Sequence, residues 1–354
     1  MWGEHRRAIL AQRIEAALKG DYLANPNMTM SELFDKFMSA KRRRLEATTV
    51  DRYSSLFTTY VQPQLGVVKI ASLRKAHLVD AYDNWQSREN RKPSGRTVKH
   101  AHDLIRALLN WAVSLDYVVS NVATKIKAED LPKAPKPENK VLRASELCSL
   151  LSQARTPTER SMSRNTLSSQ PWFYPAIAFA AYTGARRGEV LGLKWSDLDL
   201  DLRRVTIRRS LAQPRSGLVF KEPKNGKRRT ISIPADLVSI LHHHHERQSE
   251  ERLFCESAYV DQDLVFADAT GQCAKPWNFG AAFKDLVRRG GGPSITLHDL
   301  RDTHASLLAW AGVGLDVISE RLGHSSIGIT ADRYLSVYKE RDAEAATAFE
   351  QMIG

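Results

Sequence analysis

The sequence predicts a mainly α-helical protein of two domains, the second of which contains a small antiparallel β-sheet. Apolar residues recur at helical spacing over most of the chain, a proline- and lysine-rich stretch interrupts the pattern at 131–140, and short β-branched segments follow Asp199. The length of 354 residues also suits two domains of ordinary size. We therefore expect a helical module followed by an α+β domain.

The first part of the chain is expected to be a set of helices. Residues 6–19 carry an apolar stripe at helical spacing and end before Gly20, and further helices are expected to begin at Ser31 and at Thr48. The best-formed predicted helix runs over residues 98–116. One of its sides is formed by Ala101, Ile105, Leu108, Leu109 and Ala112.

Basic residues are concentrated in this helical part. The whole chain has 52 Lys and Arg against 40 Asp and Glu, a net charge of +12. Clustered cations displace the counterions condensed on a duplex, so nucleic acid is the leading candidate partner, and a merely basic soluble protein is the alternative. A single charge run is more often a solvated face than a DNA contact. The candidate DNA-binding residues are Lys41, Arg42, Arg43, Arg44, Arg96 and Lys99.

The cysteines and the apolar runs indicate the compartment. Cys148, Cys255 and Cys273 are widely spaced and form no CxxC pair, which favours a reducing, intracellular compartment. No apolar run approaches the roughly 18–20 residues of a membrane span, and residues 1–13 lack the apolar segment of a secretory signal. We therefore expect a cytoplasmic protein with no membrane partner. Cys148 is expected to be packed within a helix that begins at Ala144.

Residues 131–140 read LPKAPKPENK, and their prolines and lysines predict an extended, semi-rigid linker. Beyond it, the predicted strands are 204–208, 217–220 and 229–233. Between the last two lies Asn225-Gly226, the strongest short signal for a hairpin turn. The histidine run at 242–245 is expected at a solvated helix end, where it covers all faces of the helix and forms no ordered metal site.

Four separated segments carry candidate chemistry, and the first two are weak when taken alone. In the first, TGARRGEVLGLKW at 183–195, a helix is expected to end at Gly184 and another to begin near Arg186. A guanidinium at the positive end of a helix suits a phosphate, although an arginine there is usually just solvated. The second is Lys224 at the predicted hairpin tip, where an ammonium can reach into a cleft. Without context we prefer to interpret it as a solubilising turn lysine.

The third segment is LHDLR at 297–301. His298 and Arg301 are three residues apart, so a helix turns both to one face, and Thr296 with Asp299 resembles a capping box. The fourth is LGHSS at 322–326, with Tyr334 ten residues beyond its histidine. A lone tyrosine in a C-terminal helix normally serves packing.

Together, TGxRxxE, a lysine before RRTxSIP, HxLR, LGHSS and the later tyrosine occur in the order found in tyrosine recombinases. The chain resembles the phage and mobile-element integrase branch of that family over residues 28–354. The resemblance implies an N-terminal helix or connector at 1–27, a helical core-DNA-binding domain at 28–126, a linker at 127–140, and an α+β catalytic domain with a C-terminal tail at 141–354. The two domains would form a C-shaped clamp around a duplex.

The resemblance also implies the residues that carry the reaction. The two arginines among them would clamp the nonbridging oxygens of a DNA phosphate, and His324 would donate a further hydrogen bond to it. Glu189 would brace the first segment as a buried carboxylate, and His304 would be support rather than catalyst. The family's catalytic positions fall on Arg186, Lys224, His298, Arg301, His324 and Tyr334.

In this scheme the phenol of Tyr334 attacks the phosphate and leaves a 3′-phosphotyrosine and a free 5′-hydroxyl, so neither ATP, a metal nor another cofactor is implied. A tyrosine phenol in water has a pKa of about 10, so it needs help at neutral pH, and His298 is the candidate proton acceptor. Lys224 is the candidate general acid for the leaving 5′-oxygen. Lys221 and Lys227 are close rivals for that role because hairpin lengths vary.

The implied function is a site-specific recombinase that integrates or excises a prophage or mobile element in the bacterial nucleoid. Its expected partners are double-stranded DNA and, on DNA, three further copies of itself in a homo-tetrameric synaptic complex, with accessory DNA-bending proteins left open. The apolar stripe of the tail at 341–353 would pack on its own domain or dock into a neighbouring protomer. Two alternatives remain: a type IB topoisomerase, and a DNA-binding regulator with a decayed active site.

Overall fold

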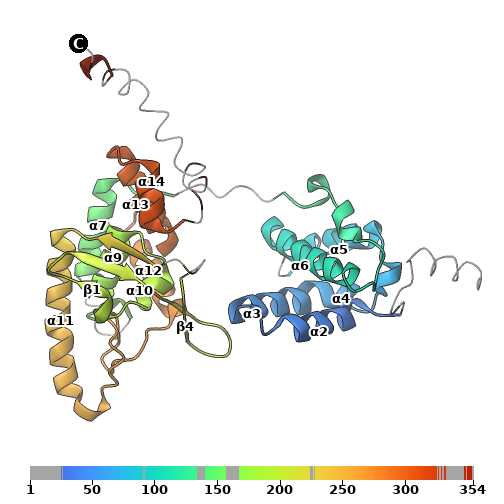
Figure 1. The fold of residues 1–354 in the computed structure, drawn as a ribbon, viewed down its shortest axis with the longest axis horizontal. Coiled ribbons are helices and arrows are strands. Elements are labelled where there is room, and N and C mark those ends of the chain that lie inside the picture. The colour runs from blue at the N-terminus through green and yellow to red at the C-terminus, as the bar shows by residue number, and fades with distance from the viewer. Residues whose placement is uncertain are drawn as a thin grey trace, which may run out of the picture. The chain divides into compact units, whose positions relative to one another are not determined.

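The computed structural model is mainly helical with small antiparallel sheets, which confirms the predicted fold class, and it divides into two compact units, Met1–Pro137 and Glu138–Gly354 (Figure 1). Each unit has a hydrophobic core of its own. The described residues are 25, 27–90, 92–133, 140–156, 167–223, 226, 228–324, 326, 328, 331, 347 and 349–352. The helix predicted at 6–19 lies outside them, as does most of the tail.

The first unit consists of helices joined by short helical turns. Its elements are α2 (Met30–Lys41), α3 (Ala47–Leu56), the π-helical turn η1 (Phe57–Val61), α4 (Gln62–Leu65), η2 (Ile70–Ser72), α5 (Lys75–Gln86), α6 (Gly95–Val113), η3 (Val122–Lys125) and η4 (Ala128–Asp130). The predicted apolar side of α6 is buried throughout and packs on α2 and α3. A stacked pair, Phe34 and Phe57, with ring centroids 3.9 Å apart, joins the same core.

Two helices of this unit, α2 and α6, begin earlier than the sequence predicts, because polar caps fix their ends. Helix α2 starts after Thr29 rather than at Ser31, since Thr29 and Glu32 exchange two hydrogen bonds of 2.8 and 3.2 Å in a capping box. Helix α6 starts after Ser94, whose hydroxyl accepts from the backbone N–H of Thr97 at 3.2 Å. The caps satisfy backbone donors that apolar periodicity does not report.

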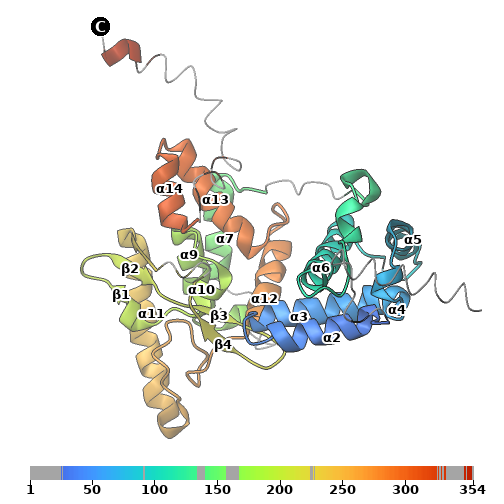
Figure 2. The ribbon, with the colours of Figure 1, turned by 45° about the vertical axis from the view of Figure 1, so that its right-hand side comes forward.

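The second unit is built around α9 (Phe173–Thr183), which is buried almost all round. Helices α7, α10, α11 and α13 contact it, and Figure 2 shows it among them. The other helical elements in the described part of this second unit are α7 (Ala144–Arg155), η5 (Leu167–Ser169), α10 (Arg187–Leu191), η6 (Trp195–Asp197), α11 (Ala235–Cys255), η7 (Glu256–Ala258), α12 (Pro276–Arg289), α13 (Leu297–Trp310) and α14 (Leu315–Leu322).

Two small antiparallel sheets lie in this unit. Strands β1 (Leu198–Asp199), β2 (Arg204–Ile207) and β5 (Arg229–Ser232) form one sheet in the order β1-β2-β5, with Ile207 opposite Arg229. Strands β3 (Ser210–Ala212) and β4 (Val219–Lys221) form the other.

The predicted hairpin between 217–220 and 229–233 is wrong, because β4 and β5 belong to different sheets. The chain does turn near Gly226, which has a φ of 65° and donates its backbone N–H to Pro223 at 2.9 Å. However, β4 pairs back to β3, and β5 pairs with β2 so that Ile231 enters the core. An Asn-Gly turn reverses the chain but does not choose the partner of the strand that follows it.

Two further expectations need correction. Cys148 is exposed rather than packed, because α7 turns Leu150 and Ala154 to the core instead. In the histidine run on α11, His244 is buried, whereas its three neighbours in the run are exposed. Its Nε2 donates to the Val265 carbonyl at 2.6 Å, and burial lowers its pKa to about 4. Within the described part of the chain, no helix is long and apolar enough to cross a membrane.

Candidate active site

The first motif segment connects α9 to α10 through a tight turn. Helix α9 ends at Gly184, which adopts a left-handed conformation with a φ of 63°, and Arg186 is the N-cap of α10, as predicted. A Cβ added at Gly184 would lie 2.6 Å from Leu322 Cδ2 and 2.9 Å from His304 Cδ2. Both the conformation and the close approach therefore require glycine here.

Helix α13 carries the third motif. The Asp299 carboxylate accepts from the backbone N–H of Thr296 at 2.7 Å and from its hydroxyl at 2.9 Å, which fixes the helix start. His298 in the first turn is exposed, whereas Arg301 is only 1% exposed. The Arg301 guanidinium donates from Nη1 to the Gly184 carbonyl at 2.9 Å and is thereby held against the first motif.

The end of α14 accepts hydrogen bonds from three arginines. The backbone carbonyls of residues 321–323 accept, in this order, from Arg229 at 2.9 Å, Arg301 at 2.6 Å and Arg186 at 3.4 Å. The last carbonyls of a helix have no partner within it and carry partial negative charge, so guanidinium groups suit them. His324 follows directly, and its backbone N–H donates to the Ser319 carbonyl at 3.0 Å. The structure thus brings Arg186, Arg301 and His324, which are distant in sequence, to one place.

A buried carboxylate joins two of these arginines. Glu189 is 1% exposed and accepts from the Arg186 backbone N–H and Nη1, both at 2.9 Å. It also accepts from Arg229 Nη1 at 3.1 Å and Nη2 at 2.7 Å. Burial opposes its ionisation, but the hydrogen bonds and charges of Arg229 and Arg186 outweigh it and lower the pKa of Glu189 to about 2. Glu189 therefore has the bracing place expected from the sequence.

A second set of contacts, which the sequence did not indicate, is centred on Arg321. Its guanidinium donates to His304 Nε2 at 3.0 Å, to Ser232 O at 3.0 Å and to Tyr182 O at 3.2 Å. A carbonyl can only accept, so the 3.0 Å contact between His304 Nδ1 and Ala181 O places the proton on Nδ1. Burial, followed by the charge of Arg321, lowers the pKa of His304 to about 3. His304 is therefore buried and neutral, and its expected role as support rather than catalyst stays a prediction.

A cavity of about 500 Å³ lies beside His298. It contains two cationic groups, Arg187 and Lys284, and Trp277, which is 75% exposed. The sequence does not indicate Trp277 and Lys284, because a lone exposed tryptophan or lysine has no motif. Arg187 lies within the first motif, but the TGxR pattern selects its neighbour Arg186. The residues that line the cavity are Arg187, Trp277, Gly280, Ala281, Lys284, Thr296, Leu297 and His298.

Several predicted residues are not tested by this geometry. Lys224, Lys227 and Tyr334 lie outside the described residues, whereas Lys221 lies on β4 and is half-buried. The candidate DNA-binding residues lie at the end of α2 and at the start of α6. Five of them are exposed and Lys41 is half-buried. Their roles stay predictions.

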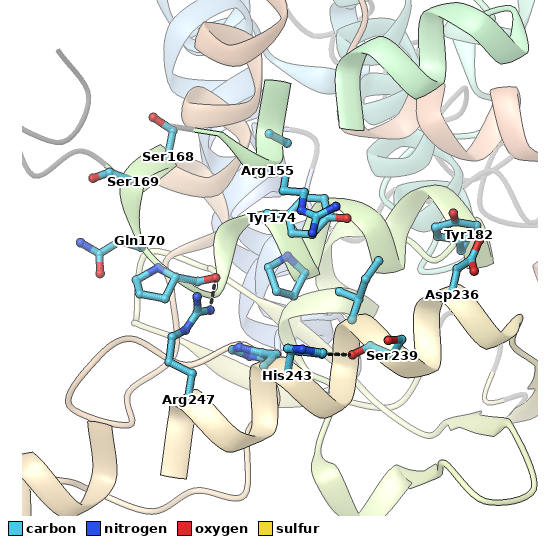
Figure 3. A pocket seen from close by; sticks show the side chains of 15 residues that line it. Arg155, Ser168, Ser169, Gln170, Tyr174, Tyr182, Asp236, Ser239, His243 and Arg247 are labelled. Carbon is cyan, nitrogen blue, oxygen red and sulfur yellow. Dashed lines mark hydrogen bonds between the residues drawn. The ribbon is translucent and has the colours of Figure 1, made fainter. Parts of the chain in front are cut away.

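A larger cavity of the second unit lies elsewhere. Its volume is about 700 Å³, and its described lining comes from α7, η5, α9, α11 and the segment between η5 and α9, without any of the six predicted catalytic residues (Figure 3). Arg247 donates there to the Pro171 carbonyl at 2.5 Å. Among the residues that the structure describes, no group of three or more His, Cys, Asp or Glu is arranged to hold a metal ion.

Comparisons with known families agree with this arrangement. The phage integrase family matches residues 140–341, and the SAM-like N-terminal domain of phage integrases matches residues 29–86. A tyrosine recombinase XerC-like protein of Caldanaerobacter subterraneus subsp. tengcongensis is 27% identical over 92% of this chain and 84% of its own length. The integrase of Mycobacterium phage D29 is 26% identical over 92% of this chain and 79% of its own.

Solved structures show the same fold. The Tn1549 transposon integrase in complex with transposon right-end DNA superposes with a TM-score of 0.74 at 20% identity, covering 90% of this chain and all of that one. A lambda integrase tetramer bound to a Holliday junction superposes with a TM-score of 0.62 at 15% identity, covering 92% of this chain and 85% of that one.

Proposed function

Because this chain belongs to the phage integrase family and is a site-specific tyrosine recombinase that breaks and rejoins DNA, we propose that Tyr334 is its nucleophile. The phenol oxygen of Tyr334 attacks a DNA phosphorus, and the bond from phosphorus to the 5′-oxygen breaks. The phenol proton passes to His298, and Lys224 gives a proton to the leaving 5′-oxygen. Rejoining is the reverse reaction with a 5′-hydroxyl of the partner strand.

The observation that carries this proposal is the convergence of Arg186 and Arg301 on the end of α14, next to His324. Arg301 is held by two carbonyls at 2.9 and 2.6 Å, and Arg186 is held by Glu189 and a third carbonyl. Guanidinium groups fixed in this way need little reorganisation when charge builds up on the phosphate oxygens in the transition state. His298, three residues before Arg301, borders a cavity that contains two further cations.

The chain binds DNA, and we extend the proposal to the way in which it does so. Most contacts are made to phosphates and fewer to base edges. Four copies assemble on DNA for strand exchange; the lambda integrase, of like fold, forms a tetramer on a Holliday junction. The site of action is the bacterial nucleoid.

A plasmid that carries two recombination sites of this protein as direct repeats tests the proposed function. Recombination should give two product circles that a restriction digest separates from the parent. A type IB topoisomerase would give relaxed topoisomers without recombinants, and a DNA-binding regulator would give a mobility shift alone. Either of these two results, obtained with the cognate site, would overturn the proposal.

Phosphate-dominated binding predicts a steep dependence of affinity on salt. The logarithm of the association constant should fall linearly with the logarithm of salt concentration, with a slope of about −0.9 for each phosphate neutralised on duplex DNA. Arg43→Ala and Arg44→Ala should each reduce the magnitude of this slope by about 1 if they contact phosphates. Fluorescence anisotropy at several salt concentrations measures it. A flat dependence in the wild type would contradict binding that is dominated by phosphate contacts.

A further inference from the structure

Arg229 is buried at the start of β5, and each nitrogen of its guanidinium has a defined partner. Nη1 and Nη2 bind the two oxygens of Glu189 at 3.1 and 2.7 Å, and Nε donates to the Arg321 carbonyl at 2.9 Å. This bidentate geometry is the strongest pairing that an arginine makes with a carboxylate. One side chain therefore ties the N-terminal end of α10 to the C-terminal end of α14.

The hydrogen bonds around Glu189 leave no acceptor site for a second contact from the Arg186 side chain. A carboxylate has about four lone-pair sites. Arg229 occupies two, the Arg186 backbone N–H a third, and Arg186 Nη1 the fourth. Arg186 is thus bound to Glu189 through a single side-chain nitrogen, and its other terminal nitrogen donates to the Gly323 carbonyl at 3.4 Å.

Close packing fixes the position of Arg229 on its other side. Gly323 adopts a φ of 65°, and a Cβ added there would lie 3.0 Å from Arg229 Cδ and 3.1 Å from its Nη1. The turn that presents His324 therefore rests directly on the Arg229 side chain. Arg229 also follows Lys224 by five residues and pairs with Ile207 of β2, so it anchors the chain just after the lysine-bearing segment.

We propose that Arg229 is a positioning residue for strand cleavage: by saturating Glu189 and holding the end of α14, it keeps the Arg186 guanidinium directed at the DNA phosphate. The inference rests on the proposed function of Arg186 and His324. Without Arg229, two acceptor sites of a buried carboxylate open beside Arg186. Its guanidinium would then rotate into a bidentate pair with Glu189 and turn away from the phosphate.

The test is single-turnover formation of the covalent adduct at saturating DNA, with a nicked suicide substrate. Arg229→Met should cleave about 10²-fold more slowly, the size of effect that a displacement of roughly 1 Å near the reacting atoms produces. Its DNA affinity should be little changed. Adding Glu189→Gln removes the negative charge that draws Arg186 away, so the double variant should cleave faster than Arg229→Met alone. A purely structural role predicts that the second change slows the enzyme further.

Arg228→Met is the matched control, because Arg228 is adjacent in sequence, is 64% exposed and pairs with the exposed Glu222. It should cleave as the wild type does. Equal loss in both variants, an unchanged rate in Arg229→Met, or further loss in the double variant would each overturn the inference. If Arg229→Met fails to fold in a thermal melt, Arg229→Lys replaces it. Lysine keeps the charge but lacks the planar fork, so Arg229→Lys should be slow and be accelerated by Glu189→Gln. Absence of a Tyr334 adduct in the wild type would instead overturn the proposed function.

Discussion

A Tyr334→Phe variant is expected to bind DNA as the wild type does but to form no covalent adduct. The change removes the hydroxyl oxygen that would bond to phosphorus, and neither the arginines nor a histidine can replace a missing nucleophile in this reaction. Binding should persist because a single phenol contributes little to an interface dominated by phosphate contacts. A nicked suicide substrate traps the adduct, which a denaturing gel separates from free protein, while a native gel reports binding.

Tyr338→Phe is the matched control for this experiment. Tyr338 lies four residues beyond Tyr334, but it is not at the distance from LGHSS at which the family carries its nucleophile. The control variant should form the adduct at the wild-type level. Peptide mapping of the wild-type adduct should locate the DNA on Tyr334. An adduct that persists in Tyr334→Phe, or that maps to Tyr338, would contradict the assignment.

The helices are the part of the fold that the sequence predicts well. In α6, the five residues predicted to form the apolar side are all buried, because a packed helix buries residues at a period of 3.6, and Val98, His102 and Leu104 are buried as well. The ends were less accurate: α6 spans 95–113 rather than 98–116. They depend on single hydrogen bonds, such as that between Ser94 and Thr97, rather than on the pattern.

Strand pairing could not be derived from local signals. The segment at 217–220 contains β-branched and aromatic residues, yet Val219 and Phe220 of β4 remain substantially exposed in a two-stranded sheet. What decides the partner of β5 is burial of Ile231 beside β2, a contact between segments more than twenty residues apart. β-Propensity describes a strand's fit to a sheet surface and contains no information about which sheet.

The sequence indicates the motifs of the candidate site but not the hydrogen bonds that connect them. The resemblance to the integrase motifs gives Arg186, His298, Arg301 and His324 as candidate catalytic residues. Arg229 and Arg321 donate to backbone carbonyls near the ends of α14, β5 and α9. Every residue has a backbone carbonyl, so the sequence does not show which carbonyls accept these bonds. The strand predicted at 229–233 does begin with Arg229, but the sequence does not show that Arg229 is buried and Arg228 exposed.

A Lys224→Ala variant is expected to cleave ordinary DNA roughly 10²–10⁴-fold more slowly than the wild type, the usual range for loss of general acid–base catalysis. A general acid matters only while the leaving group is poor. If sulfur replaces the bridging 5′-oxygen, a thiolate leaves without needing a proton. The same variant should therefore recover most of its rate on the 5′-thio substrate. Single-turnover adduct formation on the two substrates measures the ratio.

Arg186→Ala provides the contrast. The Arg186 guanidinium acts on the nonbridging oxygens, which the sulfur leaves unchanged. This variant should therefore remain slow on both substrates. Equal slowness of Lys224→Ala on both substrates would mean that Lys224 positions the strand rather than protonating it. Lys221→Ala and Lys227→Ala then decide between the neighbouring lysines. Lys221 is the last residue of β4 and lies two residues before the turn in which Gly226 donates to the Pro223 carbonyl. Rescue of either variant by the 5′-thio substrate would assign the general acid to that residue. Only the residue that protonates the 5′-oxygen becomes dispensable when the leaving group needs no proton.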